Sequence, residues 1–228
     1  MSRAHPARKH TGWSSRFAES PRAPKKATHM PVAARQACKL YRKAPRNVVM
    51  LSIDEKTGIQ AIERKHPGRS PVPGRLRRRE FEHVLHGTQA LIAALDVHIG
   101  QVLAECRDRR TQDDLVSFME RVAAAYPDKQ VHVVWDNLNT HRAQAVWQAF
   151  NARHDKRFRF HFTPLHASWV NQIELWFARY TRRVLRHASH TSTAHLRERT
   201  ERFLSEHDQA ARPFKWSFRG YPLQSGTS

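Results

Sequence analysis

Three carboxylates stand where buried structure is expected to bring them together, and their chemistry is that of a divalent metal site. Asp54 closes the apolar run 48–53, Asp136 closes a second run at 131–135, and Glu174 follows on a strongly patterned helix. Burying a carboxylate without a partner is costly or forces it to take up a proton. Magnesium prefers oxygen ligands and is commonly held by one or two carboxylates together with substrate phosphates. The three residues therefore predict a metal-dependent site.

The overall charge indicates a polyanionic substrate. The chain has 40 Lys and Arg against 20 Asp and Glu, which gives a formal net charge of +20. Such an excess is typical of proteins that bind nucleic acid and not of enzymes that act on neutral metabolites. No apolar run approaches the roughly 20 residues that span a bilayer, and no signal peptide is recognisable. Cys38 and Cys106 suggest neither a disulfide framework nor a zinc ribbon, so we expect a cytoplasmic protein without a membrane partner.

The hydrophobic pattern predicts one domain over residues 47–205, preceded by a basic segment 1–46 and followed by a tail 206–228. Short β-branched runs predict strands, and apolar residues at helical spacing predict helices. We expect strands at 48–54, 90–95, 101–104, 130–136 and 158–162, and helices that begin at Thr111, near Ala143, near Ser168 and at 194–204.

This order of elements is that of the ribonuclease-H-like fold, an α/β fold in which helices flank a mixed five-stranded sheet. The runs 90–95 and 101–104 would form a hairpin around the turn 96–100. In this fold the first and fourth strands lie side by side, which would bring Asp54 and Asp136 together. A dinucleotide-binding sheet is a weaker interpretation, because no Gly-x-Gly-x-x-Gly turn follows either strand.

Residues 1–46 have the composition of disorder, because Lys, Arg and Pro are frequent and apolar residues are few. Two interpretations stay open for this segment. It is either a solvated or eroded extension or an arm that contacts nucleic acid, since basic tails bind phosphates without sequence preference. A short helix at 31–43 is compatible with Pro31 in its first turn.

The helix that carries Glu174 offers further polar side chains. Glu174 borders the stripe that begins at Ile173, and Asn171 shares its face, where it could orient the carboxylate or touch DNA. Four arginines without interleaved acids suit a phosphate backbone better than a merely solvated face. The predicted DNA contacts are Lys56, Asn171, Arg179, Arg182, Arg183 and Arg186.

Other polar residues have simpler interpretations. Glu55 should point away from Asp54 by strand alternation, which excludes it from the metal site. Asp96 could be an auxiliary ligand, although a role in the turn is simpler. His141 and His166 could contact DNA, or they could form structural hydrogen bonds.

Three ordered blocks carry a resemblance to a known family. They are 54–58 (DEKTG), 135–141 (WDNLNTH) and 166–174 (HASWVNQIE), with further likeness at 63–67 and 213–218. The blocks resemble the catalytic motifs of bacterial insertion-sequence transposases of the mariner-related group, within the superfamily of DDE endonucleases. The likeness extends over roughly residues 38–223.

The resemblance implies a DNA transposase catalytic domain that performs metal-dependent strand cleavage and strand transfer. It implies two Mg²⁺ ions, with Mn²⁺ as a substitute; Asp54 would bridge them, Asp136 would hold one and Glu174 the other. It also implies double-stranded transposon ends and a TA target as partners, a homodimer on DNA, and a bacterial cytoplasm where the protein associates with the nucleoid.

One departure from the family concerns DNA recognition. Transposases of this group carry helix-turn-helix modules before the catalytic domain, and residues 1–46 lack the length and periodicity for them. A separately encoded portion could supply them. Two rival functions are a nuclease of the same fold that only hydrolyses DNA, and a catalytically idle DNA-binding remnant.

Overall fold

Strand β1 is the centre of a five-stranded mixed sheet. The computed structural model describes residues 41–42, 45–65, 82–135, 143–163 and 171–215. The strands are β1 (Val48–Arg64), β2 (His83–Asp96), β3 (Val102–Arg107), β4 (Gln130–Trp135) and β5 (Phe158–Phe162). The helices are α2 (Gln112–Ala125), α3 (Gln144–Arg153), α4 (Ile173–Tyr180), the π-helical turn η2 (Thr181–Leu185) and α5 (Thr193–Gln209).

The strand order is β3-β2-β1-β4-β5. β1 pairs with β2, and β2 with β3, in antiparallel fashion. β4 lies parallel to both β1 and β5. The predicted hairpin and the adjacency of the first and fourth strands are confirmed, and the topology is that of the ribonuclease-H-like fold.

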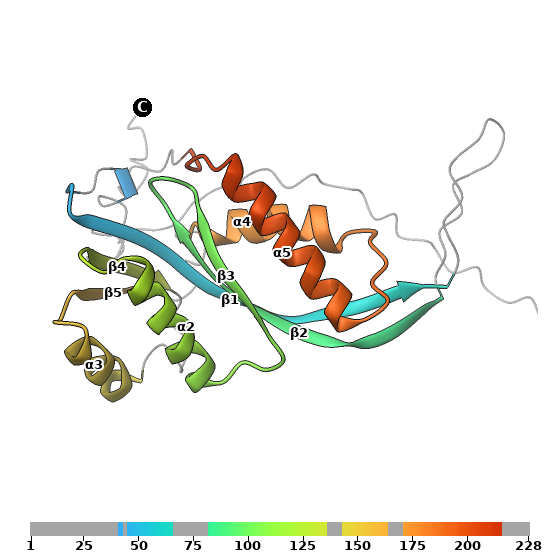
Figure 1. Ribbon diagram of the computed structural model, residues 1–228, viewed down its shortest axis with the longest axis horizontal. Helices are drawn as coiled ribbons and strands as arrows, with labels where there is room; N and C mark the ends of the chain where they lie inside the picture. The colour runs from blue at the N-terminus through green and yellow to red at the C-terminus, as the bar shows by residue number, and fades with distance from the viewer. Residues whose placement is uncertain (1–40, 43–44, 66–81, 136–142, 164–170, 216–228) are drawn as a thin grey trace, which may run out of the picture.

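Each face of the sheet buries its own hydrophobic core, as expected for strands whose side chains alternate. Helices α2 and α3 cover one face, and α4, η2 and α5 cover the other (Figure 1). The α2/α3 face receives Leu51 and Ile53 from β1. The opposite face is filled mainly from α4, where the predicted stripe of Ile173, Phe177, Tyr180 and Val184 is buried together with Trp176.

β1 is longer than predicted, because it continues past Asp54 to Arg64. Its second half pairs with β2 in a two-stranded ribbon that extends beyond the rest of the sheet (Figure 1). The register shifts between Lys56 and Ile59, next to Gly58 at φ 65°. This bulge changes the alternation, so that odd-numbered Ile59 lies on the face that even-numbered residues occupy upstream. Asp54 therefore lies inside a strand and does not end it.

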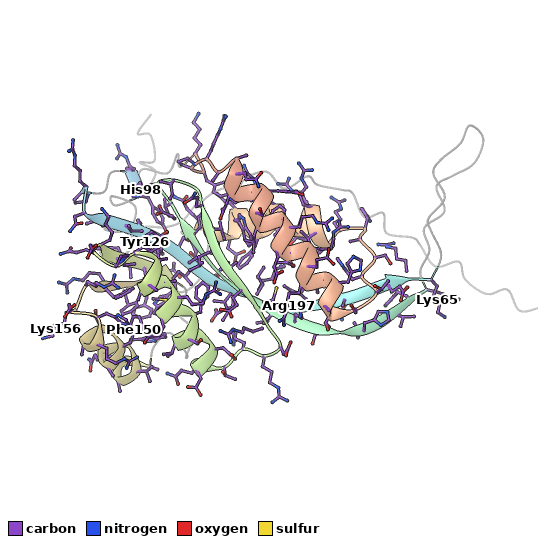
Figure 2. All side chains as sticks on the ribbon, viewed as in Figure 1. Lys65, His98, Tyr126, Phe150, Lys156 and Arg197 are labelled. Atoms are coloured by element: carbon purple, nitrogen blue, oxygen red, sulfur yellow. The ribbon has the colours of Figure 1, made fainter. Side chains whose placement is uncertain are left out.

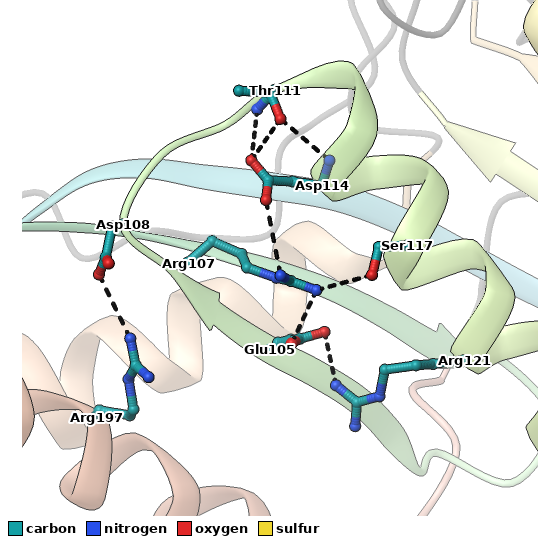
Figure 3. A network of polar contacts seen from close by, with 8 residues as sticks. All are labelled: Glu105, Arg107, Asp108, Thr111, Asp114, Ser117, Arg121 and Arg197. Carbon is teal, nitrogen blue, oxygen red and sulfur yellow. Dashed lines mark hydrogen bonds and ion pairs between the residues drawn. The ribbon is translucent and has the colours of Figure 1, made fainter.

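The helix start predicted at Thr111 is confirmed, and it is a capping box (Figure 3). The Thr111 hydroxyl accepts a hydrogen bond from the Asp114 backbone N–H (3.1 Å), and the Asp114 carboxylate accepts one from the Thr111 N–H (2.9 Å). Arg107 of β3 lies 3.7 Å from Asp114 and 2.9 Å from Glu105. The cap thus fixes α2 against the edge strand of the sheet.

Two helix boundaries differ from prediction. α4 begins at Ile173, and non-helical Asn171 and Gln172 precede it, whereas Ser168 lies outside the described residues. α5 runs to Gln209, beyond the end that was predicted at residue 204. Residues 1–40, the basic loop 66–81 and the tail 216–228 lie outside the described residues. Among the helices that the structure describes, none is long and apolar enough to cross a membrane.

The C-terminal end of α5 closes over the β2–β3 turn. The Val102 N–H donates to the Asp208 carboxylate (2.9 Å), and the His207 ring lies 2.9 Å from the Gly100 carbonyl oxygen. Gly100 has φ +81°, and a Cβ added there would meet the Arg212 backbone at 2.3 Å. The turn therefore requires glycine for its dihedral angles and for close packing.

We predict that Gly100→Ala lowers the free energy of unfolding by about 2–4 kcal/mol, because left-handed strain and a backbone clash add. Urea unfolding would measure this loss. The matched control is Gly58→Ala, which has the same sign of φ but open space around the added Cβ, and should cost only about 1 kcal/mol. Equal losses would contradict the packing argument.

Candidate functional site

Asp54 lies on the face of β1 that α4 covers. It pairs with Ala93, which belongs to the core beneath α4, and it is 8% exposed. Its Oδ1 accepts a hydrogen bond from the Glu55 N–H (2.8 Å), and its Oδ2 accepts one from the Asn171 amide (3.1 Å). Glu55 pairs with Ile92 of the opposite core, which agrees with its predicted exclusion from the site.

Asn171 joins the start of α4 to β1. It is 1% exposed, and its Nδ2 donates to the Ile53 carbonyl (3.0 Å) as well as to Asp54. Its Oδ1 accepts a hydrogen bond from the Ser52 hydroxyl, whose oxygen accepts the Ile173 N–H (2.9 Å). Asn171 was predicted to orient the carboxylate of Glu174 or to touch DNA, but the carboxylate that its side chain contacts is that of Asp54.

Glu174 lies in the first turn of α4, and its side chain is exposed. Its backbone N–H donates to the Asn171 carbonyl (3.3 Å). One asparagine therefore contacts the carboxylate of Asp54 with its side chain and the backbone of Glu174 with its main chain. The first turn of a helix also favours negative charge.

The second predicted carboxylate, Asp136, lies outside the described residues, as do His141 and His166. β4 is described up to Trp135, and its register places Val134 opposite Ser52. Within the described ranges, no group of three or more His, Cys, Asp or Glu residues could hold a metal ion. The meeting of all three carboxylates stays a prediction.

The donors that the structure describes fit a hard divalent cation. Asp54 presents a carboxylate whose orientation two hydrogen bonds fix, and Glu174 adds a second carboxylate from the adjacent helix start. Carboxylate oxygens are the ligands that Mg²⁺ and Mn²⁺ prefer. Ligands held by hydrogen bonds of this kind are typical of metal sites.

Asp96 is not an auxiliary ligand, because it lies at the turn and on the other face of the sheet. It pairs with Leu51, which faces the α2/α3 core. Its carboxylate accepts hydrogen bonds from the His98 N–H (3.0 Å) and the Tyr126 hydroxyl (3.4 Å). Figure 2 labels His98 and Tyr126 at this end of the molecule. Burial raises the pKa of Asp96, and the role in the turn is the one that the structure shows.

The four arginines predicted to contact DNA, Arg179, Arg182, Arg183 and Arg186, form an arginine stripe that is exposed along α4 and η2. η2 holds Arg182 and Arg183, and Arg186 follows it. The Arg179 guanidinium lies 4.5 Å from the centre of the Phe214 ring. With α5, the stripe borders an open pocket of about 770 Å³ that Arg199 and Arg202 also line. Arg199 and Arg202 were not among the predicted contacts, although their spacing of three on a predicted helix was a signal.

Lys56 is half-buried on β1, two residues beyond Asp54. Alternation along the strand places it on the same face as Asp54, because the register shift begins only after it. Its predicted contact with phosphate stays a prediction.

The structure also brings together two histidines that were not predicted to pair. His132 of β4 and His161 of β5 stack with ring centres 5.0 Å apart, and the two facing ring nitrogens lie 3.0 Å apart. Alternation puts both on the Asp54 face of the sheet, because Val131 and Phe158 face the α2/α3 core. Burial, and then the charge of His132, lowers the pKa of His161 to about 4.

The chain matches a known protein family over most of its folded part. A family described as "DDE superfamily endonuclease" matches residues 49–197. No curated protein matches the chain.

Several solved structures are similar to this chain. The Mos1 mariner paired end complex with Mn has 17% identity and a TM-score of 0.47, and the match covers 86% of this chain and 60% of that one. The Mos1 mariner paired end complex with Mg has 13% identity and a TM-score of 0.33, and the match covers 89% of this chain and 69% of that one. The simian T-cell lymphotropic virus intasome in complex with PP2A regulatory subunit B56 gamma has 13% identity and a TM-score of 0.44, and the match covers 68% of this chain and 47% of that one. The chain thus spans about 60% of the length of the first Mos1 chain.

We predict that Asn171→Ala destabilises the protein by about 2 kcal/mol, because it removes the buried hydrogen bonds that Asn171 makes with Ser52, Ile53 and Asp54. It should also reduce the rise in melting temperature that Mg²⁺ causes. The matched control is Asn151→Ala, which removes two hydrogen bonds to Phe158 on the other side of the sheet. If both variants kept the full Mg²⁺ effect, Asn171 would be structural only.

We also predict that stability falls on acidification because of His161. Its folded pKa of about 4 lies below the ordinary value of 6.5, so the unfolded chain binds the proton more tightly. This contribution is complete above pH 6.5 and is lost as the pH falls towards 4, with about 1–2 kcal/mol gone at pH 5. His161→Gln should show a flatter profile in urea unfolding between pH 7 and pH 5; an unchanged profile would contradict this origin.

Proposed function

Since the chain belongs to the DDE superfamily endonuclease family, we propose that it is the catalytic domain of a DNA transposase, which cleaves DNA strands and transfers the cut ends to a target. The observation that carries the proposal is the buried Asp54 carboxylate, which Asn171 orients beside the start of the helix that bears Glu174. A buried, hydrogen-bonded carboxylate on a strand, next to the start of a helix that carries a second carboxylate, suits the binding of catalytic metal ions.

We propose Asp54, Asp136 and Glu174 as the ligands of two Mg²⁺ ions, with Mn²⁺ as a substitute. The parallel register supports the place of Asp136, because position 136 follows Val134 by two residues, as Asp54 follows Ser52. Bound ions would activate the attacking oxygen and stabilise the leaving oxygen of a phosphoryl transfer. The protein's own part is to orient Asp54 and to hold the start of the Glu174 helix beside it, which Asn171 and Ser52 do through the hydrogen bonds that join α4 to β1.

DNA as the substrate is supported by the charge of the whole chain, +20, and by the exposed arginines that continue from the helix of Glu174. We propose double-stranded transposon ends and a TA target as the DNA partners, bound by a homodimer in the nucleoid of a bacterial cell. A separately encoded helix-turn-helix portion would supply recognition of the ends.

We predict that Asp54→Ala, Asp136→Ala and Glu174→Ala each reduce Mg²⁺-dependent DNA cleavage at least about a hundredfold, because each removes a metal ligand. DNA affinity and the fold should change little. The assay supplies supercoiled plasmid and a pre-cleaved end, so that nicking and end joining are separate products. Asp128→Ala, which removes an exposed carboxylate, is the control.

The same assay distinguishes the two rivals. Nicking without end joining would identify a nuclease that only hydrolyses DNA. Loss of both products in the unmodified protein would identify a DNA-binding remnant. Full activity of Glu174→Ala would overturn the assignment of the third carboxylate.

A further inference from the structure

The pocket between η2 and α5 concentrates positive charge. Five arginines line it, two of them from η2 and two from α5, and Glu206 is the one acidic side chain in the lining. Its volume is about 770 Å³. Guanidinium groups gathered around a hollow of this kind bind phosphate oxygens well, because each presents several donors in a fixed plane.

Few of these arginines are engaged with protein carboxylates. Arg202 pairs with Glu198 at 2.8 Å, and Arg179 stacks on Phe214. For Arg182, Arg183 and Arg199 the structure shows no ion pair within its described ranges, and all three are exposed. Like charges that crowd without internal partners repel one another, so an external polyanion is the ligand that would relieve this repulsion.

The pocket lies on a different flank of α4 from Glu174. At 3.6 residues per turn, the five residues from Glu174 to Arg179 correspond to a rotation of about 140° around the helix. α5 packs on the Arg179 side, as shown by the contact of Trp176 and Tyr180 with Phe203 at ring distances of 5.7 and 5.9 Å. The metal-binding carboxylates and the arginine pocket are therefore separate surfaces that share one helix.

We propose that this arginine pocket anchors the phosphate backbone of DNA and holds it independently of the metal-binding carboxylates. The proposal rests on the proposed function, because it takes DNA as the substrate, and it adds Arg199 and Arg202 of α5 to the binding surface. A second anchoring point would fix the direction of the duplex across α4, which a single contact at the carboxylates does not do.

The test measures the affinity of the full chain for a short random-sequence duplex against salt concentration, in EDTA. Each lost phosphate contact lowers the slope of log affinity against log salt by about 0.9. Arg183→Gln with Arg199→Gln, one from each wall, should therefore flatten the slope by about 1.8. The matched control is Arg109→Gln with Arg110→Gln, which removes the same charge from an exposed loop before α2 and should leave the slope unchanged.

Two further arms sharpen the result. Arg183→Lys with Arg199→Lys should keep the slope of the unmodified protein, because the charge is retained. Inorganic phosphate should compete only weakly compared with duplex. Equal slopes for the pocket variant and its control would overturn the proposal, and so would stronger competition by phosphate than by duplex. Because no metal is present, these outcomes do not depend on cleavage; a protein that binds through the pocket and cleaves nothing would refute the proposed function alone.

Discussion

The hydrogen bonds between Asn171 and β1 fix the relation between the sheet and α4. A strand and a helix that meet through apolar packing alone can slide by fractions of a turn, since hydrophobic contact has no direction. Hydrogen bonds have direction, and those of Asn171 and Ser52 are buried, where an unmade bond is costly. They hold α4 at one position along β1, and the aromatic core beneath α4 and α5 forms around that position. The same contacts fix where Glu174 stands relative to Asp54.

The two faces of β1 bury side chains of different kinds: apolar side chains on one face and polar side chains of the candidate site on the other. Leu51 and Ile53 face the α2/α3 core, while Ser52 and Asp54 face α4. The polar side chains buried under α4 are tolerated because neighbouring groups form hydrogen bonds with them, and the same hydrogen bonds orient them. The part of the site formed by Asp54, Ser52 and Asn171 is thus built into the folded core.

The sequence predicted the elements whose signals are local. The capping box at Thr111 and the helical spacing of Phe177 and Tyr180 gave α2 and α4, and the order of strands gave the sheet. The length of β1 was missed, because residues 55–58 hold no apolar side chain and the buried positions that follow, Ile59 and Ala61, are separated by an exposed residue. The start of α4 was missed because Asn171, which looks compatible with a helix, bonds to a strand more than a hundred residues away. The arginine pocket depends on which helix packs beside η2, and periodicity alone does not contain that information.

The bond between Val102 and Asp208 also has a consequence for the order in which the chain can fold during synthesis. The two residues are 106 positions apart, and the β2–β3 turn depends on the end of α5 to cover it. The sheet and the α2/α3 layer can form while the ribosome is still adding residues, because domains fold from the N-terminal side as they emerge. The layer that holds Asp54 closes only when α5 has left the exit tunnel, so the candidate active site is among the last parts of this domain to become complete.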